Sequence, residues 1–229
     1  MRSRVSQLAV CGVMVLASLV AIGRMIGFGR ASVPPPSVAL PTAPLSLESN
    51  VRGNDSAPIG MIIFSDFQCP FCARFATEVF PGLVEDYVSR GQLLVEFRHL
   101  PLTGIHPLAF RAAAVAECAG AQGRFWQMHD RLFAAQRTLS AEFLDRAAGD
   151  GDVDGGAFAS CLSQAGTRRV EADVALSKEL ALRVTPTFII GAVEGGKRLM
   201  PIRAFSGAKS RKYFDDTIAE VLRTVNRQS

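Results

Sequence analysis

Apolar and polar positions change their period several times along the chain, and these changes define the predicted elements. Residues 59–64 are a continuous apolar run of strand length, which is typical of a strand buried on both faces. Residues 92–100 alternate and predict a second strand. Between them we expect a helix over residues 69–89, which Pro81 and Gly82 should kink or split. This order predicts a βαβ unit with a right-handed crossover.

The second half of the chain changes to a helical period and then returns to strands. From residue 107 to about residue 182 the pattern is helical, and glycines separate about four or five predicted helices. Residues 187–191 predict a third strand, and residues 197–205 should return beside it as a hairpin. The final helix has a single core-facing stripe, formed by Phe214, Ile218, Val221, Leu222 and Val225. We therefore expect an α/β fold that contains an inserted all-helical block.

The N-terminal 30 residues have the pattern of a targeting segment. Arg2 and Arg4 precede an almost uncharged run over residues 5–23, as in a secretory signal or a membrane anchor. The run is close to the minimum for a bilayer span, and no convincing A-x-A cleavage site follows it. A retained anchor in the cytoplasmic membrane is the first expectation and a cleaved signal the second. A lipoprotein modified at Cys11 is a distant third.

Differences in composition divide the remainder of the chain into a linker and a folded part. Residues 31–50 are rich in proline and predict a semi-rigid linker. We expect residues 51–103 and 184–229 to form the α/β domain, and residues 104–183 the helical insertion. This length is sufficient for one compact domain with a subdomain. In all three alternatives for the N-terminus, the domain lies on the periplasmic or extracytoplasmic side of a membrane, where disulfides persist.

The net charge of +4 does not indicate a nucleic-acid-binding surface. Four arginines precede the first acidic residue, and the rest of the chain has 21 basic and 21 acidic residues. The predicted folded part is therefore formally neutral, and no basic patch is implied.

Two cysteines lie where the first strand meets the first helix. Cys69 and Cys72 are separated by Pro70 and Phe71. A helix that opens at Cys69 presents unpaired N–H groups to its sulfur, which favours the thiolate. We predict that Cys69 is the exposed nucleophile and that Cys72, one turn later, resolves a mixed disulfide. Pro70 suits the first helical turn because its missing N–H costs nothing there.

Two other interpretations of the pair are half of a zinc site and two ordinary buried cysteines. Zinc normally requires a second close pair of ligands, and the other cysteines (Cys11, Cys118 and Cys161) are scattered singly. The strand-to-helix position favours the redox interpretation.

Two segments give the chain a family resemblance. Residues 64–75, F-S-D-F-Q-C-P-F-C-A-R-F, resemble the active-site segment of the DsbA-like thiol-disulfide oxidoreductases of the thioredoxin superfamily. Residues 184–190, V-T-P-T-F-I-I, resemble the segment that carries the cis-proline of that superfamily. The resemblance covers residues 51–225 and implies a thioredoxin fold with an inserted all-helical subdomain.

The resemblance also implies roles for two residues that face the cysteine pair. Pro186 should follow a cis peptide bond, and Thr185 should offer backbone groups to an incoming peptide. An ordinary trans proline at the start of a strand is the alternative.

The sequence departs from the family at two positions. Strongly oxidising members have a histidine where this chain has Phe71, so we expect a less acidic Cys69 and a less oxidising disulfide. Many members have a buried carboxylate where this chain has Ile63. Asp66 is the nearest acid and either substitutes for that carboxylate or is a solvated residue at the strand end.

The remaining candidates lie mostly in the helical block. An exported protein rarely keeps two free thiols, so we expect a structural disulfide between Cys118 and Cys161; two buried reduced cysteines are the alternative. His99, His106 and His129 have no obvious catalytic partners in the sequence, so packing or surface roles are favoured over metal binding.

These observations predict an exported or membrane-anchored thiol-disulfide oxidoreductase that acts on protein or peptide thiols, most simply as a dithiol oxidase. A membrane redox partner would restore the disulfide, and the chemistry needs no cofactor or metal. One alternative is a periplasmic reductase or isomerase. The other is a redox-inert, peptide-binding module of the same fold.

Overall fold

The computed structural model describes residues 38–147 and 153–227, which contain one six-stranded sheet and its covering helices. The strand order is β1-β6-β5-β3-β4-β2. β3 and β4 are parallel, and every other neighbouring pair is antiparallel. The strands are β1 (Leu45–Ser46), β2 (Val51–Arg52), β3 (Ile59–Ser65), β4 (Leu93–His99), β5 (Thr187–Glu194) and β6 (Arg198–Ser206).

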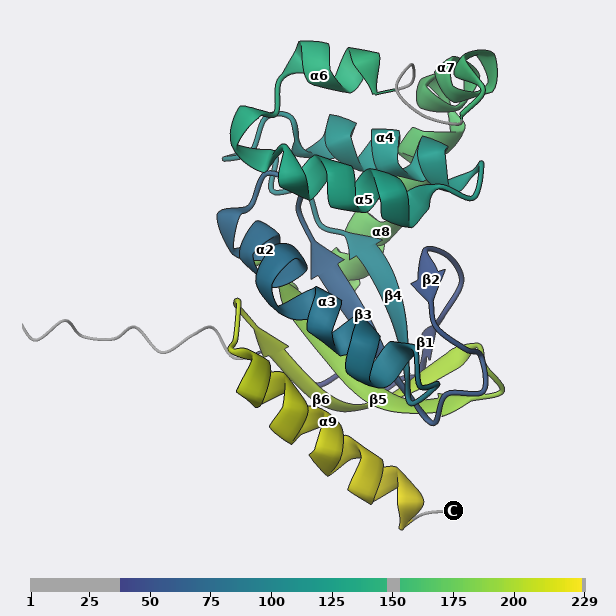
Figure 1. Cartoon of the computed structure of the whole chain (residues 1–229), viewed down its shortest axis with the longest axis vertical. Helices are drawn as coiled ribbons and strands as arrows, with labels where there is room; N and C mark the ends of the chain where they lie inside the picture. Colours follow the sequence, from purple (N-terminus) through teal and green to yellow (C-terminus); the bar gives the residue numbers. More distant parts are fainter. Residues whose placement is uncertain (1–37, 148–152, 228–229) are drawn as a thin grey trace, which may run out of the picture. The chain divides into compact units, whose positions relative to one another are not determined.

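Helices cover both faces of this sheet. They are α2 (Pro70–Arg74), α3 (Phe80–Leu83), α4 (Ala109–Gly120), α5 (Phe125–Ala134), α6 (Ala141–Arg146), α7 (Gly155–Ser163), α8 (Ala165–Glu179) and α9 (Arg211–Asn226). The other helical turns are two π-helical segments, η1 (Phe75–Val79) and η2 (Val84–Val88), and one 3-10 turn, η3 (Gln136–Thr138). Figure 1 shows α2, α3 and α9 in front of the sheet and α8 behind it.

β3 is the central strand, and all seven of its residues are buried. The side chains of Ile59, Met61 and Ile63 pack on the face that the helix after β3 and α9 cover. Ile62 and Phe64 point to the opposite face. The continuous apolar run is therefore explained by burial on both faces.

Pro81 and Gly82 were predicted to kink or split the helix that follows β3, and it is not split, since helical turns continue from Pro70 to Val88. It widens instead: the N–H of Phe80 donates to the carbonyl of Phe75, and that of Ser89 to the carbonyl of Val84. Proline has no N–H and its ring crowds the carbonyl four residues earlier. The π-helical turns η1 and η2 on either side of α3 accommodate it.

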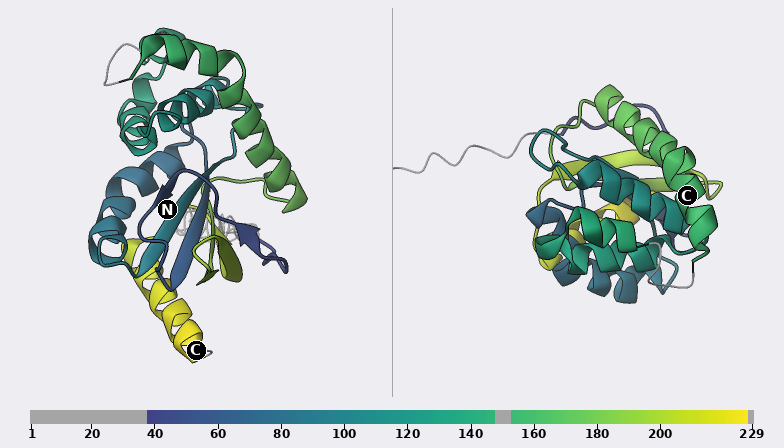
Figure 2. Two further views of the ribbon diagram at one scale, coloured as in Figure 1. Left: turned by 90° about the vertical axis from the view of Figure 1, so that its right-hand side faces the viewer. Right: turned by 90° about the horizontal axis from the view of Figure 1, so that it is seen from above.

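The helical insertion is confirmed as a layered block that extends from one end of the sheet. α4 packs against α5, α6, α7 and α8, and its Ala112, Val115 and Ala119 are fully buried. Figure 1 and the left view of Figure 2 show α6 and α7 beyond α4 and α5 from the sheet. α8 returns along the far face of the sheet, and its Asp173 pairs with Arg98 on β4.

The sheet begins inside the range predicted as linker. β1 pairs with β6, and both Leu45 and Leu47 are buried. The backbone N–H groups of Glu48 and Ser49 donate to the buried carboxylate of Glu96 on β4. The chain then reaches the opposite edge, where β2 pairs with β4. Residues 45–52 therefore belong to the folded domain, because they bury apolar side chains and supply the two edge strands of the sheet, β1 beside β6 and β2 beside β4.

The predicted membrane segment, residues 5–23, lies outside the described residues. Within residues 38–147 and 153–227, no helix is both long enough and apolar enough to cross a bilayer.

Candidate active site

Cys69 is the N-cap residue of α2, with Pro70 in the first turn. The turn before it is closed by a hydrogen bond from the N–H of Cys69 to the carbonyl of Asp66 (3.1 Å). Gln68 fixes this turn to the helical subdomain, since its side-chain oxygen accepts from the N–H of Leu108 and its carbonyl accepts from Gln136 Nε2. Two subdomains therefore position the first cysteine.

The two sulfurs are free thiols in unequal environments. Cys69 is 4% exposed and Cys72 is 0% exposed. Cys72 lies among apolar side chains of the core and one helical turn deeper than Cys69. Cys69 was predicted to be exposed to solvent, and this is wrong for the thiol form, because both cysteines are buried and Cys69 only has the larger exposed fraction of the two.

The surroundings of Cys69 favour its thiolate. The hydrogen bond from the Cys72 thiol, with further donors from Thr185 and the backbone of Cys72 and Phe71, outweighs burial and lowers the pKa of Cys69 to about 6. These donors include the N–H groups at the start of α2. A thiol with this pKa is largely ionised at neutral pH.

Cys72 is shifted in the opposite direction. Burial raises its pKa well above the ordinary range, and the hydrogen bond and charge of Cys69 raise it further. The Ser65 side chain and the Asp66 backbone oppose this shift. The pair is therefore one thiolate and one protonated thiol, as a nucleophile and a resolving residue require.

The Thr185–Pro186 peptide bond is cis, and it lies against the first cysteine. In its thiol form, Cys69 donates from Sγ to the carbonyl of Thr185 at 3.5 Å. While Cys69 is a thiol, the buried Thr185 hydroxyl has no hydrogen-bond partner among the described residues, so it can donate to the sulfur once Cys69 ionises. The carbonyl of Pro186 accepts from the N–H of Gly207, which connects this loop to the end of β6.

Phe71 is the exposed member of the motif. Its side chain is 52% exposed, and the guanidinium of Arg74 lies 5.7 Å from its ring centroid. It therefore adds an apolar surface beside Cys69 and no charge.

Replacing Thr185 by valine should raise the pKa of Cys69, because valine has nearly the same shape but cannot donate to the thiolate. If that bond is worth about 1.4 kcal/mol, the pKa rises by about one unit and alkylation at pH 6 slows about fivefold. The measurement is the rate of iodoacetamide alkylation between pH 4 and pH 9. Thr185→Ser keeps the hydroxyl and is the matched control, and equal profiles for the valine and serine variants would show that the hydroxyl plays no part.

Asp66 is not the solvated residue that one interpretation described. It is 2% exposed, and its carboxylate accepts from the N–H groups of Gln68 and Leu102. His106 Nδ1 lies 2.7 Å from Asp66 Oδ2. Asp66 therefore ties the loop after β4 to the active-site turn. The contact of His106 with Asp66 could not be predicted from local sequence patterns, because 40 residues separate the partners.

One group of described residues has the spacing of a metal site, but its ligand atoms are already used. His99 Nε2 lies 2.7 Å from Glu117 Oε1. The two carboxylate oxygens of Asp173 accept from Arg98 and from the N–H of His99. A buried guanidinium at this position disfavours a cation. His99 and His129 are both buried, and the latter packs among aromatic rings.

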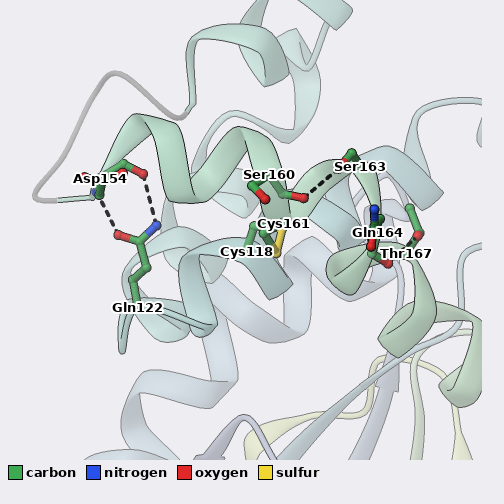
Figure 3. Close-up of a disulfide and its surroundings, with 8 residues drawn as sticks. All are labelled: Cys118, Gln122, Asp154, Ser160, Cys161, Ser163, Gln164 and Thr167. Carbon is green, nitrogen blue, oxygen red and sulfur yellow. Dashed lines mark hydrogen bonds between the residues drawn. A yellow bond between two sulfur atoms is a disulfide. The ribbon is translucent and has the colours of Figure 1, made fainter.

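A disulfide joins α4 to α7 in the helical block. Cys118 and Cys161 are bonded, with their Cα atoms 5.6 Å apart. Figure 3 shows the disulfide between these helices, with the side chain of Gln122 bonded to the backbone of Asp154 at the far end of α7. Both contacts fix α7 on the body of the subdomain.

Comparison with known proteins gives one family and several relatives. The model of the family Thioredoxin_4, described as thioredoxin, matches residues 46–200. The solved structure of alpha-DsbA1 from Wolbachia pipientis has a TM-score of 0.69 and 24% identity over 79% of this chain and 94% of that one. This likeness shows a shared fold.

Two curated relatives match smaller parts of this chain than the Wolbachia structure does. A Bacillus anthracis protein named probable disulfide bond formation protein D is 30% identical over 92 residues, which are 40% of this chain and 42% of that protein. A Salinispora tropica protein named Na(+)/H(+) antiporter NhaA 3 is 39% identical over 142 residues, or 62% of this chain. This chain spans about a fifth of the length of that relative.

Proposed function

This chain belongs to the thioredoxin family, and from that premise we propose that it is an exported thiol-disulfide oxidoreductase that exchanges a disulfide between Cys69 and Cys72 with protein thiols. The observation that carries the proposal is the placement of Cys69. It caps a helix, its pKa is lowered to about 6, and it contacts the loop that contains cis-Pro186. A redox-inert binding module has no need of a thiolate at this position.

The proposed reaction begins with the oxidised pair. A substrate thiolate attacks Cys69 Sγ, the bond to Cys72 breaks, and Cys72 leaves as a thiolate that takes up a proton. A second thiolate of the substrate attacks the substrate sulfur of this mixed disulfide and expels Cys69. Two electrons pass from the substrate to the protein, and the substrate gains a disulfide. Cys69 is a good leaving group because its pKa is low.

Oxidation of substrate dithiols is the direction we favour. The Bacillus anthracis relative is named for disulfide bond formation, which supports this direction. A membrane oxidase would then reoxidise the pair, and residues 5–23 would anchor the chain beside it. The uncharged Phe71 favours the second candidate, a reductase, because it gives the thiolate no additional support.

One experiment separates these functions. The purified protein, poised in glutathione buffers, is mixed either with a reduced dithiol peptide or with insulin disulfides. Net oxidation of the peptide in a glutathione buffer with the redox potential of an oxidising compartment supports the proposal. Faster reduction of insulin supports the reductase. Activity in neither assay supports the binding module.

Replacing Phe71 by histidine should raise the reduction potential of the pair. A protonated imidazole beside Cys69 stabilises the thiolate, which belongs to the reduced form. A charge-assisted bond of about 1.5–3 kcal/mol corresponds to roughly 30–65 mV. Equilibration with glutathione buffers measures the potential, and Phe71→Leu is the uncharged control. An unmoved potential in the histidine variant would mean that the helix and backbone donors alone set the stability of the thiolate.

A further inference from the structure

A pocket lies on the helical subdomain, and none of its lining residues belongs to the active site. It has a volume of about 300 Å³, and its walls come from α4, α7, α8 and the segment before β2. Its polar and sulfur-bearing walls are Ser49, Asn50, Glu117, Cys161 and Arg169.

The guanidinium of Arg169, which lines this pocket, has one edge without a partner among the described residues. Nη1 lies 3.4 Å from a carboxylate oxygen of Glu48. Nε and Nη2 are buried, and neither meets an acceptor among the residues that the structure describes. These two atoms form the side-on fork that binds a carboxylate with two parallel hydrogen bonds. The hydroxyl of Ser49 is another buried donor without a partner in the described chain.

An acidic group lines the same pocket. Burial opposes the ionisation of Glu117, but the hydrogen bond and charge of His99, with Asn50 and Arg169, lower its pKa. Glu117 Oε1 already accepts from Asn50 Nδ2 and lies 2.7 Å from His99 Nε2, so its other oxygen, Oε2, is the atom that would face a cationic group. A ligand that satisfies both Arg169 and Glu117 carries a carboxylate and an ammonium.

The disulfide forms part of the wall. Cys161 lines the pocket and is partly exposed, whereas Cys118 is 0% exposed. Gly166 also lines the pocket, and a Cβ at this position would lie 2.6 Å from Cys118 Sγ and 3.5 Å from Cys161 Sγ. The glycine therefore leaves no side chain between α8 and the sulfurs. Cys161 is the cysteine of the pair that lines the pocket.

We propose that this pocket binds a small zwitterionic thiol, of which free cysteine is the simplest, and presents its sulfur to Cys161. The carboxylate lies on the fork of Arg169, the ammonium faces Glu117, and the thiolate meets the disulfide. This site is separate from the proposed function and makes the second disulfide an exchange site.

The exchange is balanced by two ligand molecules. The thiolate of the first attacks Cys161 Sγ, the bond to Cys118 breaks, and Cys118 leaves as a thiolate that takes up a proton. The thiolate of a second ligand molecule attacks the ligand sulfur of the mixed disulfide. This step releases the oxidised ligand dimer and the Cys161 thiol. The protein disulfide is reduced by two electrons that the two thiols supply.

The test uses the full chain with Cys69→Ser and Cys72→Ser, so that its outcome does not depend on the active site. Reduction of the remaining disulfide is followed by mass spectrometry with cysteine, cysteamine or mercaptoethanol, and each rate is corrected for the thiolate fraction. Cysteamine has the ammonium but no carboxylate. We expect cysteine to react at least tenfold faster than cysteamine, and Arg169→Gln to reduce this ratio to about one.

Arg168→Gln is the matched control, because it removes the same charge from an exposed neighbour outside the pocket and should keep the preference. If Arg169→Gln does not fold, Arg169→Lys keeps the charge without the fork and should lose most of the preference. Equal rates for the three thiols would overturn the proposal, and so would a preference that survives both substitutions at Arg169. A disulfide that no thiol reduces in the folded protein would also overturn it.

Discussion

A variant with Cys72 replaced by serine should trap its substrates as covalent mixed disulfides. Cys69 keeps its place at the start of α2, and its thiolate can still attack a disulfide of a substrate, which forms a mixed disulfide and releases the other substrate sulfur as a thiolate. The buried thiol that resolves it is lost, so the adduct has no internal route of release. We expect covalent complexes that a reductant dissolves, and turnover reduced by at least 100-fold. Non-reducing gels of cells that express the variant, with mass spectrometry of the complexes, measure both effects.

Cys69→Ser is the matched control for this trapping. Cys72 is 0% exposed and its pKa is raised, so it should neither trap substrates nor support turnover alone. Adducts on Cys72 in the Cys69→Ser variant would contradict the assignment of the nucleophile.

Removing the second disulfide should lower the free energy of unfolding by about 4 kcal/mol. The bond closes a loop of 43 residues, and the cross-link restricts the unfolded chain in proportion to the logarithm of this length. Cys118→Ala with Cys161→Ala avoids a buried hydroxyl at the fully buried Cys118. Urea unfolding at pH 7 measures the change as a lower midpoint.

The effect on stability should be separate from the effect on catalysis. Turnover of the double-alanine variant, assayed well below its unfolding midpoint, should stay within about twofold of the parent, because neither cysteine belongs to the active-site turn. An unchanged urea midpoint would show that packing of Phe158 and the bonds between Gln122 and Asp154 hold α7 without the cross-link.

Local sequence patterns predicted the elements that position the active site. The run that became β3 is apolar because both of its faces are buried, and the turn over residues 66–68 connects it to Cys69 at the N-cap of the next helix. The stripe on α9 has helical spacing, and Phe214, Ile218 and Val221 are fully buried against the sheet. A continuous apolar run and a stripe with helical spacing can be recognised in one sequence, because each is a pattern of residues within a single strand or helix.

Features that depend on contacts distant in sequence could not be predicted. β1 and β2 have two residues each, too few to show any period, and Glu48 and Ser49 are held by Glu96, which is more than 45 residues away. Two further features depend on such distant contacts: the hydrogen bond between His106 and Asp66, and the unpaired edge of the Arg169 guanidinium. The widening of the first helix around Pro81 was missed because a proline predicts disruption but not its form.

The asymmetry of the cysteine pair is the central claim, and a single-turnover experiment tests it most directly. The oxidised protein is mixed with one equivalent of a reduced dithiol peptide, quenched with acid at intervals and analysed by peptide mapping. The account predicts a transient adduct on Cys69, followed by one equivalent of oxidised peptide and a reduced cysteine pair. An adduct on Cys72, or a peptide that stays reduced while the disulfide between Cys69 and Cys72 persists, would contradict it.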